Sequence, residues 1–211
     1  MKTPIGVPLP TLRRLPLYYR LFKEKKAAGF AWLSSEAMSQ ILGFGAIQVR
    51  KDLGAVGAAG SPKRGYPIPQ TIEALSGFLG VNDYTDVFLI GSGILGQAVL
   101  ADTGLRQHGF NVVGLFDLEP DRVDQTLAGK KILPLEKLPD LTKRMGVKLA
   151  VLAVEPDQVG PAADTLVRAG IGAVLDLTGA SVLFPPEILV THENFGSSLA
   201  ALASVLKGRS S

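Results

Sequence analysis

The sequence predicts an α/β protein in which an N-terminal winged helix-turn-helix domain precedes a Rossmann-type domain built on a parallel sheet. Short helical segments separated by glycine-rich turns occupy the first 80 residues. After residue 84, short apolar strands alternate with helices, and the first strand runs into a G-x-G-x-x-G motif. We therefore expect domains at residues 1–80 and 84–193, followed by a C-terminal helix and tail at residues 194–211.

Composition narrows the class of protein. Of the 211 residues, 46% are hydrophobic and none is cysteine, which excludes disulfides, thiolate metal sites and thiol redox switches. The N-terminus lacks the apolar core of a signal peptide, and no uncharged apolar run reaches about 18 residues. We therefore expect a cytoplasmic protein without a membrane segment.

The net charge of +3 is unevenly distributed. Residues 1–76 carry 11 basic and 4 acidic side chains, a net charge of +7, which leaves −4 for the remainder of the chain. A basic first third on an acidic body favours contact with a polyanion such as nucleic acid. Chance clustering of solvated lysines is the alternative explanation.

In the N-terminal domain we expect a loose arm at residues 1–10 and a helix that starts at Pro16 and ends before Gly29. Ser34 or Ser35 provides the N-cap of a second helix. The remaining elements are a glycine turn at 43–45, a helix over 46–53, a glycine-rich segment, a helix near 70–79, and a linker, "GVND", at 80–83.

Strands of the C-terminal domain are predicted from short runs rich in β-branched and aromatic residues. Helical segments lie between them, for example at 161–169. This alternation indicates a parallel sheet covered by helices on both faces. The expected strands are 87–90, 112–116, 148–154, 173–177 and 188–191.

The second and third helices, joined by a glycine turn, have the length of a DNA-reading helix-turn-helix. At about 100° per residue, Val49 and Leu53 face inward, while Gln48 and Lys51 point outward and Arg50 lies on the flank. Glutamine reads adenine edges, and arginine or lysine reads guanine or holds phosphate. We predict that these three polar side chains contact DNA.

A wing is predicted from "SPKRGYP", which follows the third helix. Lys63 and Arg64 lie at its tip, where they suit a narrow minor groove, and Tyr66 anchors it. The alternative is a plain three-helix subdomain with a charged surface.

The second motif predicts a dinucleotide site. Gly91 permits a tight turn, Gly93 lets the backbone approach a pyrophosphate, and Gly96 lets helix and strand pack closely. Asp117 follows Gly96 by 21 residues, where a carboxylate accepts hydrogen bonds from both ribose hydroxyls and repels a 2′-phosphate, which favours NAD(H). The predicted cofactor-binding residues are Gly91, Ser92, Gly93, Ile94, Leu95, Gly96 and Asp117.

Catalytic machinery is not evident in the sequence. Of the two histidines, we interpret His108 as solvent-facing and His192, at a strand end, as structural. No Ser/His/Asp arrangement or metal cluster is present, and too little chain follows the Rossmann half for a substrate domain. We therefore expect no enzyme: the dinucleotide is a signal that is bound, not a reagent that is consumed.

These motifs together resemble the Rex family of bacterial redox-sensing transcriptional repressors over nearly the whole chain. "QVRKDL" beside a Rossmann fingerprint is highly specific to that family. The matching segments are "RRLPLYYR" (13–20), "LSSEAMSQILG" (33–43), "QVRKDL" (48–53), "KRGY" (63–66), "GSGILGQA" (91–98), "GF" (109–110) and "FDLEPDRVDQ" (116–125).

The resemblance implies a homodimer whose C-terminal helix, at about 195–206, is swapped into the partner subunit. It implies a repressor that binds double-stranded operator DNA, releases it when NADH binds and rebinds it with NAD+. By the same resemblance, Arg14, Lys63 and Arg64 hold the DNA backbone or minor groove. Gln48, Arg50 and Lys51 lie on the recognition helix.

The chain departs from the family pattern on the nicotinamide side and at the conformational switch. The switch residues are Arg20, Asp102 and Asn194: the family usually has tyrosine at Asp102 and, at Asn194, an aspartate that pairs across subunits with the arginine at Arg20. Further replacements are Ala153 for threonine, Glu155 for proline, and "DLTG" at 176–179 for "NFAP". Two alternatives stay open: a divergent member with an altered or lost redox response, or a small NAD-dependent oxidoreductase.

Overall fold

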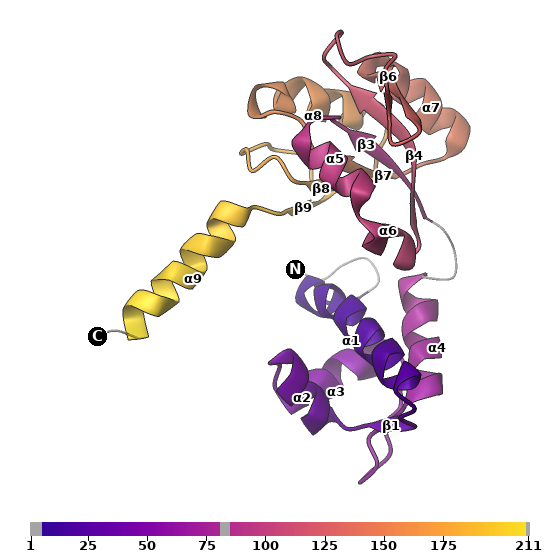
Figure 1. Cartoon of the computed structure of the whole chain (residues 1–211), viewed down its shortest axis with the longest axis vertical. Coiled ribbons are helices and arrows are strands. Elements are labelled where there is room, and N and C mark those ends of the chain that lie inside the picture. The colour runs from indigo at the N-terminus through magenta and orange to yellow at the C-terminus, as the bar shows by residue number, and fades with distance from the viewer. Residues whose placement is uncertain (1–5, 81–84, 210–211) are drawn as a thin grey trace. The chain divides into compact units, whose positions relative to one another are not determined.

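The computed structural model describes residues 6–80 and 85–209, and the chain divides into two compact units between Tyr84 and Thr85 (Figure 1). We call them the N-terminal unit and the C-terminal unit. The linker predicted at 80–83 lies, apart from Gly80, outside the described residues. Gly80 itself ends the last helix of the N-terminal unit in a left-handed conformation.

Over the described residues 6–80, the N-terminal unit consists of four helices and a two-stranded antiparallel sheet. Its helices are α1 (Leu9–Ala27), α2 (Ser35–Leu42), α3 (Ala46–Ala55) and α4 (Ile68–Leu79), and its strands are β1 (Trp32–Leu33) and β2 (Tyr66–Pro67). Ser34 is the N-cap of α2, with its hydroxyl accepting a hydrogen bond from the Ala37 amide at 3.0 Å. Gly43 ends α2 at a φ of 74°, as the sequence predicts.

The predicted start of α1 is wrong. The helix begins at Leu9, not Pro16, so Pro16 lies inside it and the end of the expected loose arm is helical. Pro8 and Pro10 occupy the N-cap and the first turn, where a missing amide hydrogen costs nothing because first-turn amides have no intrahelical partner. The earlier prolines therefore mark the helix start.

The C-terminal unit is a doubly wound α/β fold. Its strands are β3 (Thr85–Ile90), β4 (Phe110–Asp117), β5 (Thr126–Leu127), β6 (Lys130–Pro134), β7 (Leu149–Leu152), β8 (Ala173–Asp176) and β9 (Leu189–His192). Its helices are α5 (Ile94–Ala101), α6 (Thr103–Gln107), α7 (Leu138–Met145), α8 (Val159–Arg168) and α9 (Phe195–Arg209), with short 3-10 helices η1 (Leu135–Lys137) and η2 (Pro156–Gln158).

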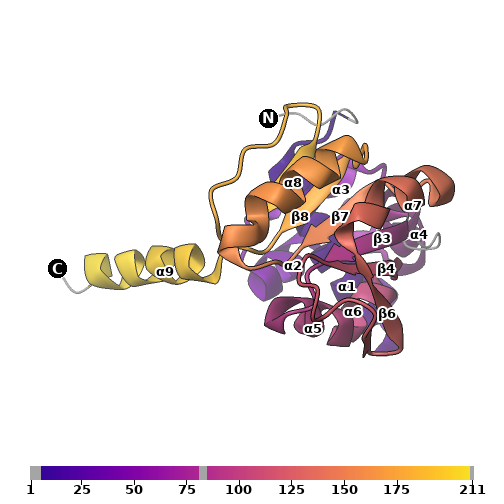
Figure 2. The ribbon, with the colours of Figure 1, turned by 90° about the horizontal axis from the view of Figure 1, so that it is seen from above.

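Seven strands form one sheet in the order β5-β6-β4-β3-β7-β8-β9. All neighbouring pairs are parallel except β5 with β6. In Figure 2 the strands run through the middle of this unit, with α7 and α8 on one face and α5 and α6 on the other. Each face has its own core: Phe88 and Ile90 belong to one apolar cluster, Val87 and Leu89 to the other.

The hairpin formed by β5 and β6 is not among the elements predicted from the sequence. No helix lies in the connection from β4 to β6, although a parallel pair usually has one in its crossover. A two-residue strand paired with β6 takes its place.

The described side chains of the C-terminal helix α9 are exposed to solvent. Every described side chain from Phe195 to Lys207 is exposed. Within the described part of the chain, no helix combines the length and the apolar character needed to cross a bilayer.

Candidate functional site

The loop after β3 has a geometry that requires glycine. Gly91 adopts a φ of 103°, and a Cβ there would lie 2.3 Å from the Ala153 carbonyl oxygen, next to β7. A Cβ at Gly96 would lie 2.0 Å from the Gly91 carbonyl oxygen, so α5 and β3 approach each other closely. The loop thus turns sharply from the strand into the helix, as the motif predicts.

Gly93 differs from its two neighbours because the space beside it is open. It is the N-cap of α5, and a Cβ there would meet only the tips of Glu155 and Arg122, at 3.4 and 3.5 Å. The first-turn amides of α5 lack intrahelical acceptors and suit an anion. Of the first-turn side chains, Ile94 is exposed and Leu95 packs on the sheet core, so both would serve a ligand through their backbone.

Asp117 ends β4 beside this loop. Its Oδ2 accepts hydrogen bonds from the Ser92 amide and hydroxyl at 2.7 and 2.5 Å, and its Oδ1 accepts one from the Glu119 amide at 2.9 Å. Burial would raise the pKa of Asp117, but these hydrogen bonds and the nearby Arg122 guanidinium outweigh it, so the pKa is lowered. The carboxylate is ionised, with one acceptor position left on Oδ1.

This arrangement refines the predicted role of Asp117. The sequence predicts hydrogen bonds to both ribose hydroxyls, whereas the carboxylate in this structure is buried and has room for one. Arg122, which the sequence analysis did not single out, lies 3.6 Å from Asp117 at the mouth of the loop. In the sequence, this contact is indicated only by spacing: the basic residue Arg122 follows Asp117 by five positions.

The opposite half of the sheet's carboxyl edge carries a second polar group. Asp176 ends β8, His192 ends β9, and the imidazole Nδ1 lies 2.7 Å from the Asp176 Oδ2. Sequence reasoning interpreted His192 as a lone structural histidine and did not pair it with Asp176. His108, the other histidine, is hydrogen-bonded to the Gly104 carbonyl, at the end of α6.

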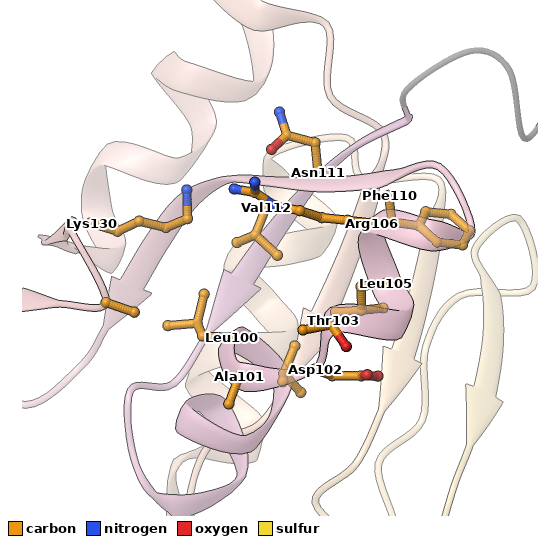
Figure 3. A pocket seen from close by; sticks show the side chains of 12 residues that line it. Leu100, Ala101, Asp102, Thr103, Leu105, Arg106, Phe110, Asn111, Val112 and Lys130 are labelled. Carbon is orange, nitrogen blue, oxygen red and sulfur yellow. The ribbon is translucent and has the colours of Figure 1, made fainter.

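A cavity of about 270 Å³ lies on the α5 face (Figure 3), beside the connection that lacks a helix. It reaches the amino-terminal part of β4 through Phe110 and Val112, away from the Gly91 loop. Asp102 lies at its rim and is exposed, with its carboxylate capping the Gly104 amide at 2.7 Å. Asp102, a predicted switch residue, is therefore not buried, and Glu155 is exposed as well.

The helix-turn-helix presents only part of its predicted reading surface. Val49 and Leu53 of α3 are fully buried and Lys51 is exposed, as the wheel predicts. The Arg50 guanidinium lies 2.9 Å from the Glu36 carboxylate of α2, where its side chain is about half exposed. Its terminal nitrogen also donates to the Ser35 hydroxyl.

A buried carboxylate that the sequence analysis overlooked lies under α3. Asp52 is 0% exposed and accepts hydrogen bonds from Arg14 at 2.6 and 2.9 Å. Thr11, Tyr18 and Gln48 donate to the same carboxylate at 2.9, 2.9 and 2.8 Å. Of the residues predicted to contact DNA, Arg14 thus links α1 to α3, and Gln48 bonds to the same carboxylate within α3.

The predicted wing is a tight turn that precedes β2. Ser61 and Gly65 bridge its base, and Gly65 is confined because a Cβ there would lie 2.5 Å from the Leu33 carbonyl oxygen. Lys63 is exposed at a positive φ of 70°, and the Arg64 guanidinium lies 5.8 Å from the Trp32 ring centroid. Both predicted tip residues are accessible.

The three predicted switch residues occupy separate surroundings. Arg20 belongs to the N-terminal unit and lies 3.6 Å from Glu24 on α1. Asn194 precedes α9, where its Oδ1 accepts a hydrogen bond from the Ser197 amide at 3.0 Å. Their joint role as a switch stays a prediction. Among the described residues, no group of three or more metal-ligating side chains comes together.

Known protein families match both units. A family described as "Putative DNA-binding protein N-terminus" matches residues 6–54, and one described as "CoA binding domain" matches residues 82–179. The redox-sensing transcriptional repressor Rex of Treponema denticola is 32% identical over 197 residues, covering 93% of this chain and 94% of that protein. The Rex of Bacteroides fragilis is 36% identical over 199 residues, covering 93% and 89%.

Solved structures of RSP, a Rex-family repressor, share the fold. RSP in complex with β-NAD+ and operator DNA superposes with a TM-score of 0.87 at 28% identity, covering 97% of this chain and 94% of that chain. RSP in complex with β-NADH gives 0.84 at 28% identity, covering 99% and 97%. The predicted fold class is confirmed, while the swap of the C-terminal helix stays a prediction.

Proposed function

The chain belongs to the Rex family of redox-sensing transcriptional repressors, and on that basis we propose that it represses transcription from a palindromic operator and releases this DNA when NADH binds. The expectation that the protein is not an enzyme is confirmed by the family. A repressor acts where its operator lies, so the proposed location is the cytoplasm.

The observation that carries the proposal is the fit of the Gly91 loop to a dinucleotide. Gly91 and Gly96 are positions where any Cβ would collide with backbone, whereas Gly93 opens onto free space at the start of α5. A pyrophosphate placed there would meet amide donors, and the ionised Asp117 would stand beside the adenosine ribose. We propose NAD(H) as the ligand, because this carboxylate disfavours a 2′-phosphate.

The N-terminal unit supports the DNA-binding half of the proposal. Lys51 projects from α3, and Lys63 and Arg64 project from the wing, so basic groups are available on both elements. Arg50 would exchange its exposed partner Glu36 for a phosphate or a base. Arg14 would act chiefly by holding α3 in place through Asp52, while the Gln48 side chain is engaged with Asp52 within α3 itself.

We propose a homodimer in which the partner subunit covers α9. Phe195, Leu199, Leu202 and Leu206 are 80, 65, 62 and 63% exposed and recur at helical spacing, so they form an uncovered apolar face. Sedimentation tests this: replacing Leu199 and Leu202 together by Asp should yield monomers. Ser204→Asp, on the opposite face of the helix, should leave a dimer.

Footprinting tests the DNA-reading surface. Arg50→Ala or Lys51→Ala should weaken protection of the operator while NADH affinity stays unchanged. Lys143→Ala, which removes an exposed basic side chain from α7, is the matched control and should protect normally. Normal protection of the operator by either α3 variant would show that the recognition-helix assignment is wrong.

Redox gating is tested by titrating the operator complex with each nucleotide. NADH and NAD+ should differ in their effect on operator affinity, because a ligand shifts an equilibrium only by its difference in affinity between the two states. Equal effects would favour the alternative of a divergent member with an altered redox response. Turnover of NADH with small carbonyl substrates would instead favour an oxidoreductase.

A further inference from the structure

Asp176 and His192 form a polar pair at the carboxyl ends of two neighbouring parallel strands. They are register partners in β8 and β9, and the imidazole Nδ1 lies 2.7 Å from the Asp176 Oδ2. The amide and hydroxyl of Thr178 donate to the other carboxylate oxygen at 2.9 and 2.7 Å. Asp176 is 1% exposed, whereas the His192 side chain is 53% exposed, so the imidazole is held on one side and open on the other.

The strand order places this pair on a defined part of the proposed ligand site. The order of strands reverses between β3 and β7, and ligands of doubly wound sheets lie across that point, outside the carboxyl ends. Asp117 ends β4 on one side of the reversal, and Asp176 ends β8 on the other. A dinucleotide with its adenosine beside Asp117 therefore extends its nicotinamide half toward β7, β8 and β9.

The two redox forms of the ligand differ in charge at that end: the oxidised nicotinamide ring is a cation and the reduced ring is neutral. With a neutral imidazole, the Asp176–His192 pair carries one negative charge, which favours the cation. With a protonated imidazole, the pair is neutral and this preference is lost. We infer that the His192–Asp176 pair sets the discrimination between NAD+ and NADH and makes it follow pH.

Other charges at this edge do not produce the same pH dependence. Glu155 follows β7, and Glu193 is next to His192 in the chain. Among the described residues, the charged group that is hydrogen-bonded to the imidazole is Asp176. Histidine is the side chain that ordinarily changes charge between about pH 5 and 8. The chain has two histidines, and His108 lies before β4, at the opposite end of the strands.

The inference rests on the proposed function and is tested on the full-length protein. Dissociation constants of NADH, from its fluorescence, and of NAD+, by displacement of NADH, are measured from about pH 5.5 to 8.5. The ratio of the NAD+ to the NADH constant should be about tenfold higher at the acid end, because the cationic ring there loses the attraction of one unit of negative charge. Operator release by NADH should shift in parallel.

The variants separate the two histidines. His192→Gln keeps a neutral donor for Asp176 and should give a ratio that does not change with pH, while His108→Gln should behave like the wild type. A constant ratio in the wild type, or a pH-dependent ratio that survives in His192→Gln, would overturn the inference. If His192→Gln does not fold, the comparison of wild type with His108→Gln still decides, because a pH dependence lost in His108→Gln would assign it to the wrong histidine. Failure of both nucleotides to bind at every pH would instead overturn the proposed function.

Discussion

Replacing Asp52 by Asn tests whether the buried carboxylate fixes α3 to α1. The substitution keeps the shape of the side chain but removes its charge and turns one oxygen into an NH2 group. That NH2 would face donors, because both carboxylate oxygens accept hydrogen bonds: Oδ2 from Tyr18 and Oδ1 from Thr11 and Gln48. Arg14 would lose its ionic partner at the same time.

The size of the effect follows from the burial of the pair. Removing one partner of a buried ion pair destabilises a protein by about 3–5 kcal/mol. Arg14 remains 19% exposed and regains some hydration, which favours the lower end, about 3 kcal/mol. For a unit of this size about 1 kcal/mol moves the melting temperature by 4–8 °C, so the expected fall is roughly 12–24 °C.

The assay uses the single tryptophan of the chain. Trp32 lies in β1, so its fluorescence during urea or thermal unfolding reports on the N-terminal unit. Glu24→Gln is the matched control, because it also removes one negative charge but from an exposed pair with Arg20. The control should unfold like the wild type. If the Asp52→Asn variant has the same unfolding midpoint as the Glu24→Gln variant, the Asp52 carboxylate does not hold the helices together.

Three further outcomes are expected. Gly93→Ala should fold normally and lose dinucleotide affinity, because its methyl group would occupy open space at the start of α5, whereas Gly91→Ala should lower thermal stability because its Cβ would meet backbone at 2.3 Å; equal melting curves for the two variants would contradict this. Lys63→Ala should weaken operator binding and reduce the slope of log affinity against log salt by about 1, measured by fluorescence anisotropy, with NADH affinity unchanged. The folded-state pKa values of Asp52 and Asp117 are lowered, so their contribution to stability is present above the unfolded value of about 4 and is lost as the pH falls through the folded values; acid unfolding followed by circular dichroism should shift to higher pH when Asp52 is replaced by Asn.

Local signals in the sequence sufficed for most elements of the fold. The N-cap at Ser34 and the glycine stop at Gly43 are chemical features of single positions, and both are correct. The start of α1 failed because three prolines compete for one role, and Pro16 is compatible with the interior of a packed helix. The β5–β6 hairpin failed because a two-residue strand carries too little periodicity to detect.

The contacts of the candidate sites also fall into those that local spacing predicts and those that it does not. The Gly91 loop and Asp117 are linked by a spacing that the sequence displays. Asp52 acts on residues 34 to 41 positions away, and Asp176 meets His192 across 16 positions. Such partners are selected by helix packing and strand register, which one sequence does not reveal.

Burial of Asp52 also changes how the motif "QVRKDL" is understood. Burial would raise the pKa of its carboxyl, but hydrogen bonds from Arg14 and from three neutral donors outweigh this and lower it. The motif therefore combines exposed side chains that suit DNA with a buried anchor. The i,i+4 spacing of Gln48 and Asp52 is visible in the sequence, whereas the packing of Arg14 against the same carboxylate, 38 positions away, is not.

The apolar clusters of the two units draw on separate parts of the chain. Among the described residues, one cluster uses positions up to Leu79, and the other two use positions from Val87 onward, with no side chain in common. Substitutions at the nucleotide edge, for example at Asp176 or His192, therefore change no side chain of the cluster beneath α3. In evolutionary terms the chain is modular: substitutions in the C-terminal unit can change the response to the nucleotide while the side chains proposed to contact DNA stay the same.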